Sequence, residues 1–133
     1  MLYFAYGSNL HHTQMKRRCK DSKFLKGYEL KGYKLNFRSK YRAADIEKKN
    51  NSIVPGALYE ISKSDEKKLD VYEDYPILYK KIFFIYYKKK VMTYYMNRKS
   101  PFTYPTERYL NVIKQGYKHC KLDTKYLIEA LKN

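Results

Sequence analysis

Apolar residues recur at two different spacings along the chain, and the spacing decides which element each segment predicts. Residues 2–6 form a short, almost wholly apolar run, which is typical of a buried strand. Residues 33–37 alternate Tyr, Leu and Phe with polar neighbours, which is the pattern of a strand with one buried face. In residues 106–119, apolar side chains recur every three or four positions and predict an amphipathic helix with Tyr109 on its inner face.

The remaining segments complete a mixed order of strands and helices. The same spacings predict further strands at 24–30, 53–61, 79–87 and 91–96, and further helices at 11–19, 66–72 and 125–131. Three connections are also predicted: a turn between 30 and 32, a hairpin turn at 88–90, and a polar loop over 38–52 around a short strand at 43–46. Ser64 is expected to cap the 66–72 helix.

This order of elements predicts an α+β fold. Sheets built from several hairpins tend to close, because closure removes exposed edges. We therefore expect a small mixed β-barrel with flanking helices. A chain of 133 residues suits a single domain, which we place over residues 1–133.

Composition narrows the class of protein further. No apolar run approaches the roughly 20 residues that span a bilayer, and no basic segment precedes the first apolar run. We expect a cytoplasmic protein with no membrane partner, either a monomer or a homodimer. Cys19 and Cys120 are far apart, and the histidines at 11, 12 and 119 have no recognised metal-ligand spacing. We expect no metal and no cofactor.

The net charge of +16 and the 17 tyrosines are features of proteins that bind single-stranded nucleic acid. The Lys and Arg residues, however, occur in every segment instead of on one stripe, and no nucleic-acid-binding motif is present. Nucleic-acid binding is therefore the less favoured alternative. The charge supports attraction of anionic small molecules.

The first predicted strand leads directly into the residues YGSNL at 6–10. Gly tolerates positive φ and Asn can follow it there, so these residues predict a tight turn before the first helix. Such a turn points several backbone N–H groups at one place and forms an anion site. Taken alone, the same residues are more often an ordinary turn.

A group of acids interrupts this otherwise basic chain at the end of the predicted 66–72 helix. Asp70, Glu73 and Asp74 lie together there, with Tyr72 and Tyr75 beside them. A carboxylate packed among aromatic rings loses solvation, which raises its pKa toward the value that a general base needs near neutral pH. The alternative is a solvated helix face that neighbouring lysines neutralise.

Four segments, in this order along the chain, resemble the γ-glutamylcyclotransferase-like superfamily. They are YGSNL at 6–10, GALYEI at 56–61, LDVYE at 69–73 and PTERYL at 105–110. The resemblance covers nearly the whole chain, and it is closer to the small bacterial members related to the plant avirulence-induced family. It implies a small mixed barrel with helices on its outside.

The resemblance also implies an activity. Members of this family convert a γ-glutamyl amine or γ-glutamyl amino acid to 5-oxoproline and the free amine, with no metal or cofactor. The family's catalytic glutamate, which acts as general acid and base, falls on Glu73. The residues that the resemblance implies for substrate binding are Tyr6, Gly7, Ser8, Asn9, Leu10, Tyr79 and Tyr109.

The sequence leaves several points open. Relatives usually have Gly after the catalytic glutamate, where this chain has Asp74, and often Arg after the tyrosine that matches Tyr79, where this chain has Lys80. Either of these residues could join the site. Either Tyr94 or Tyr95 lines the pocket, and strand alternation alone does not choose between them. A binding module on the same fold, without turnover, stays open as an alternative function.

Overall fold

The computed structural model describes residues 1–132. Within them, five strands form one mixed sheet in the order β2-β3-β1-β5-β4. The elements, in chain order, are β1 (Leu2–Ala5), the 3₁₀ helix η1 (Ser8–Leu10), α1 (His12–Arg18), β2 (Lys23–Arg38), β3 (Ala43–Glu60), α2 (Lys63–Tyr72), β4 (Tyr79–Tyr86), β5 (Lys89–Met96), α3 (Glu107–His119) and α4 (Lys125–Leu131).

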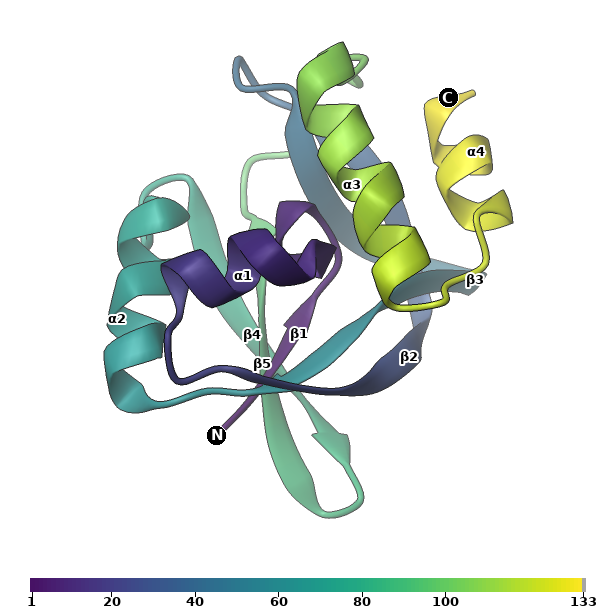
Figure 1. Cartoon of the computed structure of the whole chain (residues 1–133). Coiled ribbons are helices and arrows are strands. Elements are labelled where there is room, and N and C mark those ends of the chain that lie inside the picture. Colours follow the sequence, from purple (N-terminus) through teal and green to yellow (C-terminus); the bar gives the residue numbers. More distant parts are fainter. Residues whose placement is uncertain (133) are drawn as a thin grey trace.

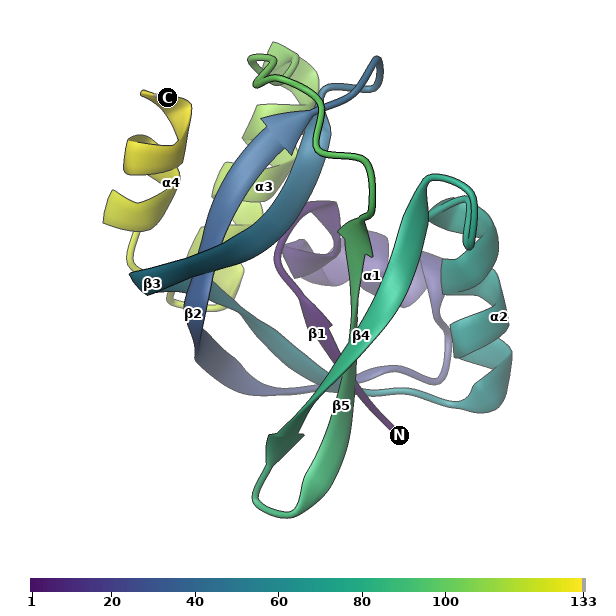
Figure 2. The same ribbon diagram turned by 180° about the vertical axis from the view of Figure 1, so that it is seen from behind.

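The short strand β1 lies in the middle of the sheet. It pairs antiparallel with β3 and parallel with β5, and all four of its residues are buried. In Figure 1, α1 and α3 lie in front of the sheet, and Figure 2, from behind, has the strands in front of both helices. The end of β1 is therefore enclosed between strands and helices, which makes it a suitable place for a cavity.

The sheet is open, so the expectation of a closed barrel is corrected. Its two edges are formed by β2 and β4, which do not pair with each other. The long strands β2 and β3 curve around the helices, and the β4–β5 hairpin extends away from them (Figure 2). The α+β fold class is confirmed.

The predicted turn near residue 31 is wrong, and the predicted loop at 38–52 is correct only for the turn at 39–42 and the short strand at 43–46. β2 continues through the first as a bulge, where the register shifts between Lys31 and Tyr33 and Gly32 has a φ of 83°. β3 occupies the second from Ala43 onward, paired with β2. Its polar side chains from Glu47 to Ser52 are largely solvated. Backbone hydrogen bonds to β2 and the ion pair between Arg38 and the buried Asp45 hold the strand, contributions that hydropathy does not report.

Two element ends also differ from the prediction. Ser62, not Ser64, caps α2, because its Oγ accepts a hydrogen bond from the Asp65 amide at 3.0 Å. The Asp65 carboxylate accepts one from the Ser62 amide in return, which completes a capping box. The β4–β5 turn lies at Tyr87 and Lys88, which both have positive φ, as two-residue hairpin turns require.

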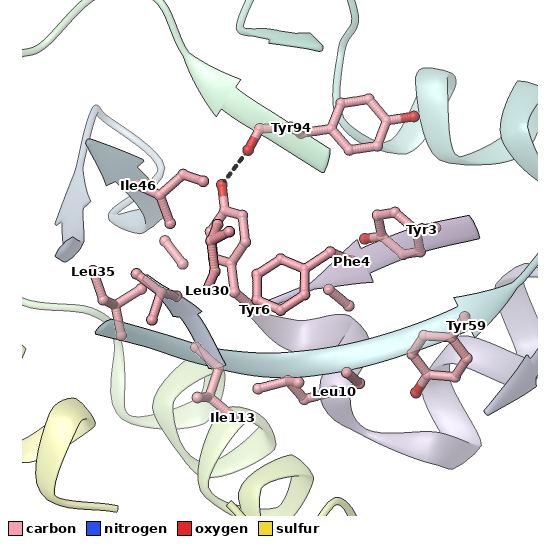
Figure 3. Close-up of a cluster of buried hydrophobic side chains, with 14 of the residues drawn as sticks. Tyr3, Phe4, Tyr6, Leu10, Leu30, Leu35, Ile46, Tyr59, Tyr94 and Ile113 are labelled. Atoms are coloured by element: carbon pink, nitrogen blue, oxygen red, sulfur yellow. Dashed lines mark hydrogen bonds between the residues drawn. The ribbon is translucent and has the colours of Figure 1, made fainter. Parts of the chain in front are cut away.

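The core forms where β1 and the segment after it pack against α3. Figure 3 shows Phe4, Leu10 and Ile113 in this cluster, with the Tyr6 hydroxyl directed at the backbone of β5. That hydroxyl donates a hydrogen bond to the Tyr94 carbonyl at 2.7 Å. A Cβ at Gly116 would lie only 2.5 Å from the Leu10 Cβ, so the helix approaches this segment at backbone distance.

All three histidines of the chain meet where α1 begins and α3 ends. The His12 amide donates to Nδ1 of His119 at 3.1 Å, and the ring centroids of His11 and His119 are 4.6 Å apart. The Cys120 Sγ lies 3.3 Å from Nε2 of His12. Within residues 1–132, no group of three or more His, Cys, Asp and Glu side chains is arranged to hold a metal ion.

None of the described helices is long and apolar enough to cross a membrane.

Candidate active site

A cavity of about 480 Å³ opens where β1 ends. Its wall is built from β1, β3, β4, β5, the end of α2 and the start of α3. Two separate parts of the chain that the sequence singled out, residues 7–9 and Glu73, both line it. The fold therefore brings the predicted anion-binding turn and the predicted catalytic carboxylate to one space.

The turn at Gly7 has a different geometry from the one predicted. Gly7 has a φ of −118°, and none of residues 7–9 has positive φ. The need for glycine comes from close packing instead: a Cβ there would lie 3.2 Å from the Tyr109 hydroxyl oxygen and 3.3 Å from the Ala44 Cβ. A side chain at this position would push the turn away from α3 and β3.

The backbone amides of this segment divide into two groups. The amides of Leu10 and His11 donate hydrogen bonds to the carbonyls of Gly7 and Ser8, both at 3.1 Å. The amides of Ser8 and Asn9 have no hydrogen-bond partner within residues 1–132. These two N–H groups are free to bind a ligand in the cavity.

Arg18, at the end of α1, holds residues 8 and 9 in place through its guanidinium group. Its guanidinium stacks on the Tyr72 ring at 3.4 Å from the centroid and donates hydrogen bonds to Ser8 Oγ at 3.2 Å and Asn9 Oδ1. The Tyr72 hydroxyl in turn lies 3.0 Å from Ser8 Oγ. Arg18 was not among the predicted site residues, because its position depends on α1 folding back over the turn.

The side chain of Asn9 is buried and forms hydrogen bonds within the protein. It is 3% exposed, its Oδ1 accepts from Arg18, and its Nδ2 donates to the Tyr3 hydroxyl at 3.1 Å. The Tyr59 hydroxyl donates to the Asn9 carbonyl at 2.9 Å. The side chain of Asn9 is therefore held by Arg18 and Tyr3, while its backbone amide has no partner within residues 1–132.

Glu73 follows the last turn of α2 as its C-cap residue. It is half-buried on the cavity wall, and its carboxylate accepts no hydrogen bond within residues 1–132. Burial removes water from this carboxylate and raises the pKa of Glu73 to about 7, while the positive charge of Arg18 lowers that pKa to a smaller extent. Glu73 can therefore take up and release a proton near neutral pH.

Two tyrosines on the wall form hydrogen bonds to the backbone of the same β3 residue, Ala44. The Tyr79 hydroxyl donates to the Ala44 carbonyl at 2.5 Å, whereas the Tyr109 hydroxyl accepts from the Ala44 amide at 3.0 Å. The proton of Tyr79 is thus already used, and the proton of Tyr109 has no acceptor within residues 1–132. Of the two hydroxyls, Tyr109 has a hydrogen-bond donor left for a ligand.

The structure chooses between the residues that the sequence left open on β4 and β5. Tyr94 lines the cavity and Tyr95 does not. The Tyr94 hydroxyl donates to Asp70 at 2.6 Å, and Asp70 pairs with Lys81 at 2.9 Å. Lys80 is exposed and does not line the cavity.

The other predicted site residues are distributed as follows. The cavity wall contains Tyr6, Gly7, Ser8, Asn9, Glu73, Tyr79 and Tyr109. Leu10 is fully buried in the core and is not part of the wall. Tyr3 and Tyr72 line the cavity without having been predicted to bind substrate, and only their place in the assembled sheet and helix brings them there.

Comparison with known proteins identifies the family and the fold. A model of the family described as "Gamma-glutamyl cyclotransferase, AIG2-like" matches residues 3–117. A solved structure named "Gamma-glutamyl cyclotransferase" superposes with a TM-score of 0.79 at 23% identity, over 98% of this chain and 85% of its own. An uncharacterised protein from Homo sapiens gives a TM-score of 0.78 at 23% identity, over 97% of this chain and 85% of its own.

A bacterial protein of known structure has the same fold as this chain. YkqA from Bacillus subtilis superposes with a TM-score of 0.81 at 21% identity, over 100% of this chain but 54% of its own. No protein with a curated description matches the sequence significantly. Since the family match spans most of the chain, this protein belongs to the gamma-glutamyl cyclotransferase, AIG2-like family.

Proposed function

We propose that this protein is a cyclotransferase that converts a γ-glutamyl amine or γ-glutamyl amino acid to 5-oxoproline and the free amine. The observation that carries the proposal is the shared cavity of Glu73 and residues 7–9. One side of this cavity offers a carboxylate that titrates near neutral pH. The other side offers two backbone amides without partners.

The proposed reaction needs a proton to be moved twice. Ionised Glu73 first accepts a proton from the α-ammonium group of the substrate. The freed amine nitrogen attacks the γ-carbonyl carbon and forms the new C–N bond of a five-membered ring. Glu73 then donates the proton to the departing nitrogen, and the original γ-amide bond breaks as the carbonyl re-forms. The regenerated carboxylate takes the second proton from the ring nitrogen and passes it to the free amine, which leaves as an ammonium ion, so that Glu73 ends ionised. A group with a pKa near 7 suits both steps, because neither form is strongly preferred at the working pH.

Positioning supplies the rest of the proposed rate enhancement. The amides of Ser8 and Asn9 would bind the α-carboxylate of the γ-glutamyl group, and Tyr109 would donate its free proton to the same end of the substrate. Binding of that end would hold the α-amine next to the γ-carbonyl carbon. In well-oriented intramolecular reactions, such positioning lowers the activation free energy by about 7–11 kcal/mol. Tyr6 and Tyr79 would complete a wall that excludes water.

The test is release of 5-oxoproline from a panel of γ-glutamyl compounds, followed by mass spectrometry. We expect turnover by the natural sequence and a loss of at least 100-fold in kcat/KM in Glu73→Gln, since a removed general acid–base typically costs about 10²–10⁴-fold. Glu129→Gln, on the exposed face of α4, is the matched control and should keep full activity. Full activity of Glu73→Gln, or binding of these compounds without any product, would reject the enzyme in favour of a binding module.

A further inference from the structure

The main cavity and a smaller cleft beside it have opposite charges. The wall of the main cavity contains Glu73 and Asp74 and, among the described residues, no Lys or Arg. The wall of the cleft, whose volume is about 230 Å³, contains Arg18 and Arg108 and, within residues 1–132, no Asp or Glu. Three residues line both spaces: Ser8, Tyr72 and Tyr109. An anionic group is therefore favoured in the cleft, next to the proposed active site but outside its acidic wall.

Arg18 keeps part of its hydrogen-bonding capacity free in this cleft. Its Nη1 donates to Ser8 Oγ and Asn9 Oδ1, whereas its Nε and Nη2 donate no hydrogen bond within residues 1–132. The face of the guanidinium stacks on the Tyr72 ring, which leaves the edge of the guanidinium plane available. The N–H donors lie along that edge, in the arrangement that matches the oxygens of a phosphate or carboxylate group. Stacking thus orients Arg18 for an oxyanion without using these donors.

Arg108 lines the same cleft from the first turn of α3. Its side chain is exposed and forms no hydrogen bond or ion pair within residues 1–132. Positions 104, 105, 111 and 112, three and four residues away along the chain, contain no acid that could pair with it. The hydroxyl of Thr106, the N-cap residue of α3, also lines the cleft, and its proton has no acceptor within residues 1–132. The cleft therefore offers a second unpaired guanidinium and a neutral donor.

We propose that this cleft binds a phosphate-type oxyanion, either inorganic phosphate or a phosphate monoester, at a site separate from the main cavity. The guanidinium groups of Arg18 and Arg108 supply two positive charges, which match a dianion better than they match the single charge of a carboxylate. The cleft has about half the volume of the main cavity, 230 Å³ against 480 Å³, and so suits a small ligand.

Occupation of the cleft should also slow the proposed cyclotransferase reaction, and this consequence rests on the proposed function. The positive charge of Arg18 favours the ionised form of Glu73, which is the form that accepts the substrate's proton. A bound dianion offsets that charge, and the wall of the main cavity has no other Lys or Arg within residues 1–132 to replace it. The other titratable groups of that wall that interact with Glu73 or follow it are all uncharged or acidic: Tyr3, Tyr6, Asp74, Tyr79, Tyr94 and Tyr109.

The test is the Kd of inorganic phosphate, glycerol phosphate and acetate for the full chain, measured by calorimetry at constant ionic strength. We expect the better of the two phosphates to bind about tenfold more tightly than acetate, and the better one identifies the free ion or the monoester as the ligand. Arg108→Gln should weaken phosphate binding about three- to tenfold. Arg98→Gln removes an exposed arginine outside the cleft and should leave phosphate binding unchanged. A Kd that Arg108→Gln does not alter would overturn the inference.

Competition shows which space the phosphate occupies. In Glu73→Gln, a saturating γ-glutamyl amide should leave the Kd of phosphate nearly unchanged, whereas displacement would place phosphate in the main cavity and overturn the second site. In the natural sequence, saturating phosphate should lower kcat/KM at pH 7 about twofold, and Arg108→Gln should relieve this at the same phosphate concentration. An unchanged kcat/KM with phosphate bound would overturn the link between the cleft and Glu73. Phosphate binding that depends on Arg108, without 5-oxoproline from any γ-glutamyl compound, would reject the cyclotransferase and keep the anion site.

Discussion

The positive charge of Arg18 lowers the pKa of Glu73, against the larger rise that burial of the carboxyl group causes. The same guanidinium donates hydrogen bonds to the side chains of Ser8 and Asn9. One side chain on α1 thus tunes the proposed acid–base group and also holds the segment proposed to bind the substrate. Variants at Arg18 should affect both, in ways that can be measured separately.

The first prediction concerns the pH dependence of turnover. Glu73 must be ionised to accept a proton, so kcat/KM should fall tenfold for each pH unit below about 7. Arg18→Gln removes the charge that lowers this pKa, so its acid limb should move to higher pH, with a rise in KM from the lost contacts to Ser8. Steady-state kinetics from pH 5 to pH 9 give both quantities.

Two controls accompany this measurement. Arg17→Gln removes an exposed neighbouring charge and should leave the profile where it is. Arg18→Lys keeps the charge but not the planar contacts, so it should raise KM with little movement of the acid limb. An acid limb that does not move in Arg18→Gln would contradict the assignment of that limb to Glu73.

The second prediction is that Glu73 lowers the stability of the folded protein above neutral pH. The folded state has a pKa of about 7 and the ordinary value is 4.5, so the native state binds this proton more strongly than the unfolded state. The stability linked to the proton is present below pH 4.5 and is lost as pH rises through 7. Glu73→Gln should therefore gain about 1–3 kcal/mol in unfolding free energy at pH 8 and little at pH 4.

Chemical denaturation at the two pH values checks this directly. The exposed control Glu129→Gln should show no such pH-dependent gain. A Glu73→Gln variant whose stability changes equally at both pH values would mean that Glu73 has the same pKa in the folded and unfolded states, contrary to the raised pKa described above.

The third prediction concerns the packing of Gly7. Gly7→Ala places a Cβ 3.2 Å from the Tyr109 hydroxyl oxygen, so we expect a loss of about 1 kcal/mol in unfolding free energy. We also expect KM to rise, by a proportion larger than the fraction of stability that is lost. Tyr109→Phe removes the atom that the new Cβ meets. In a double-mutant cycle the two changes should therefore cost less together than their separate costs added. Strict additivity would show that the close approach is not what requires glycine.

The fourth prediction concerns the histidine cluster between α1 and α3. Burial lowers the pKa of His12, and the neighbouring charges of His119 and His11 lower it further. His12 also contacts Phe24, Tyr59 and Cys120, none of which carries a compensating negative charge. Because the folded state binds the proton less readily than the unfolded state, stability linked to His12 is present above pH 6.5 and decreases as pH falls.

In a Glu73→Gln background, which removes the opposite trend of that carboxyl group, thermal unfolding between pH 5 and pH 8 should therefore show a falling Tm toward acid. His119→Gln removes one of the repelling charges and keeps an acceptor for the His12 amide, so its Tm should fall less over the same range. A steeper fall in His119→Gln would contradict the repulsion on which the prediction rests.

The sequence could predict β1, α3 and the carboxylate at Glu73, because each depends on local pattern or on a motif. It did not predict the length of β3, whose residues from Glu47 to Ser52 are all polar and lack the apolar pattern that indicates a strand. Arg18 was missed for a different reason. Its partners Tyr72 and Ser8 lie on other elements, and only the assembled fold brings the three together.

The choice of Tyr94 over Tyr95 also depended on three-dimensional context. Alternation along β5 indicates that the side chains of Tyr94 and Tyr95 point to opposite faces of the sheet. It does not indicate which face borders the cavity. That is decided by the register between β1 and β5, in which Leu2 lies beside Val91. A sequence taken alone contains no direct information on this register.

The backbone at position 74 is left-handed, with a φ of 51°. Gly, Asn and Asp adopt this conformation more readily than other residues, and they differ mainly in charge and polarity. Substitution among these three would alter the electrostatics of the cavity rim without moving the neighbouring Glu73. Position 74 is therefore a point at which the charge of the cavity rim can change while the backbone that positions Glu73 stays the same.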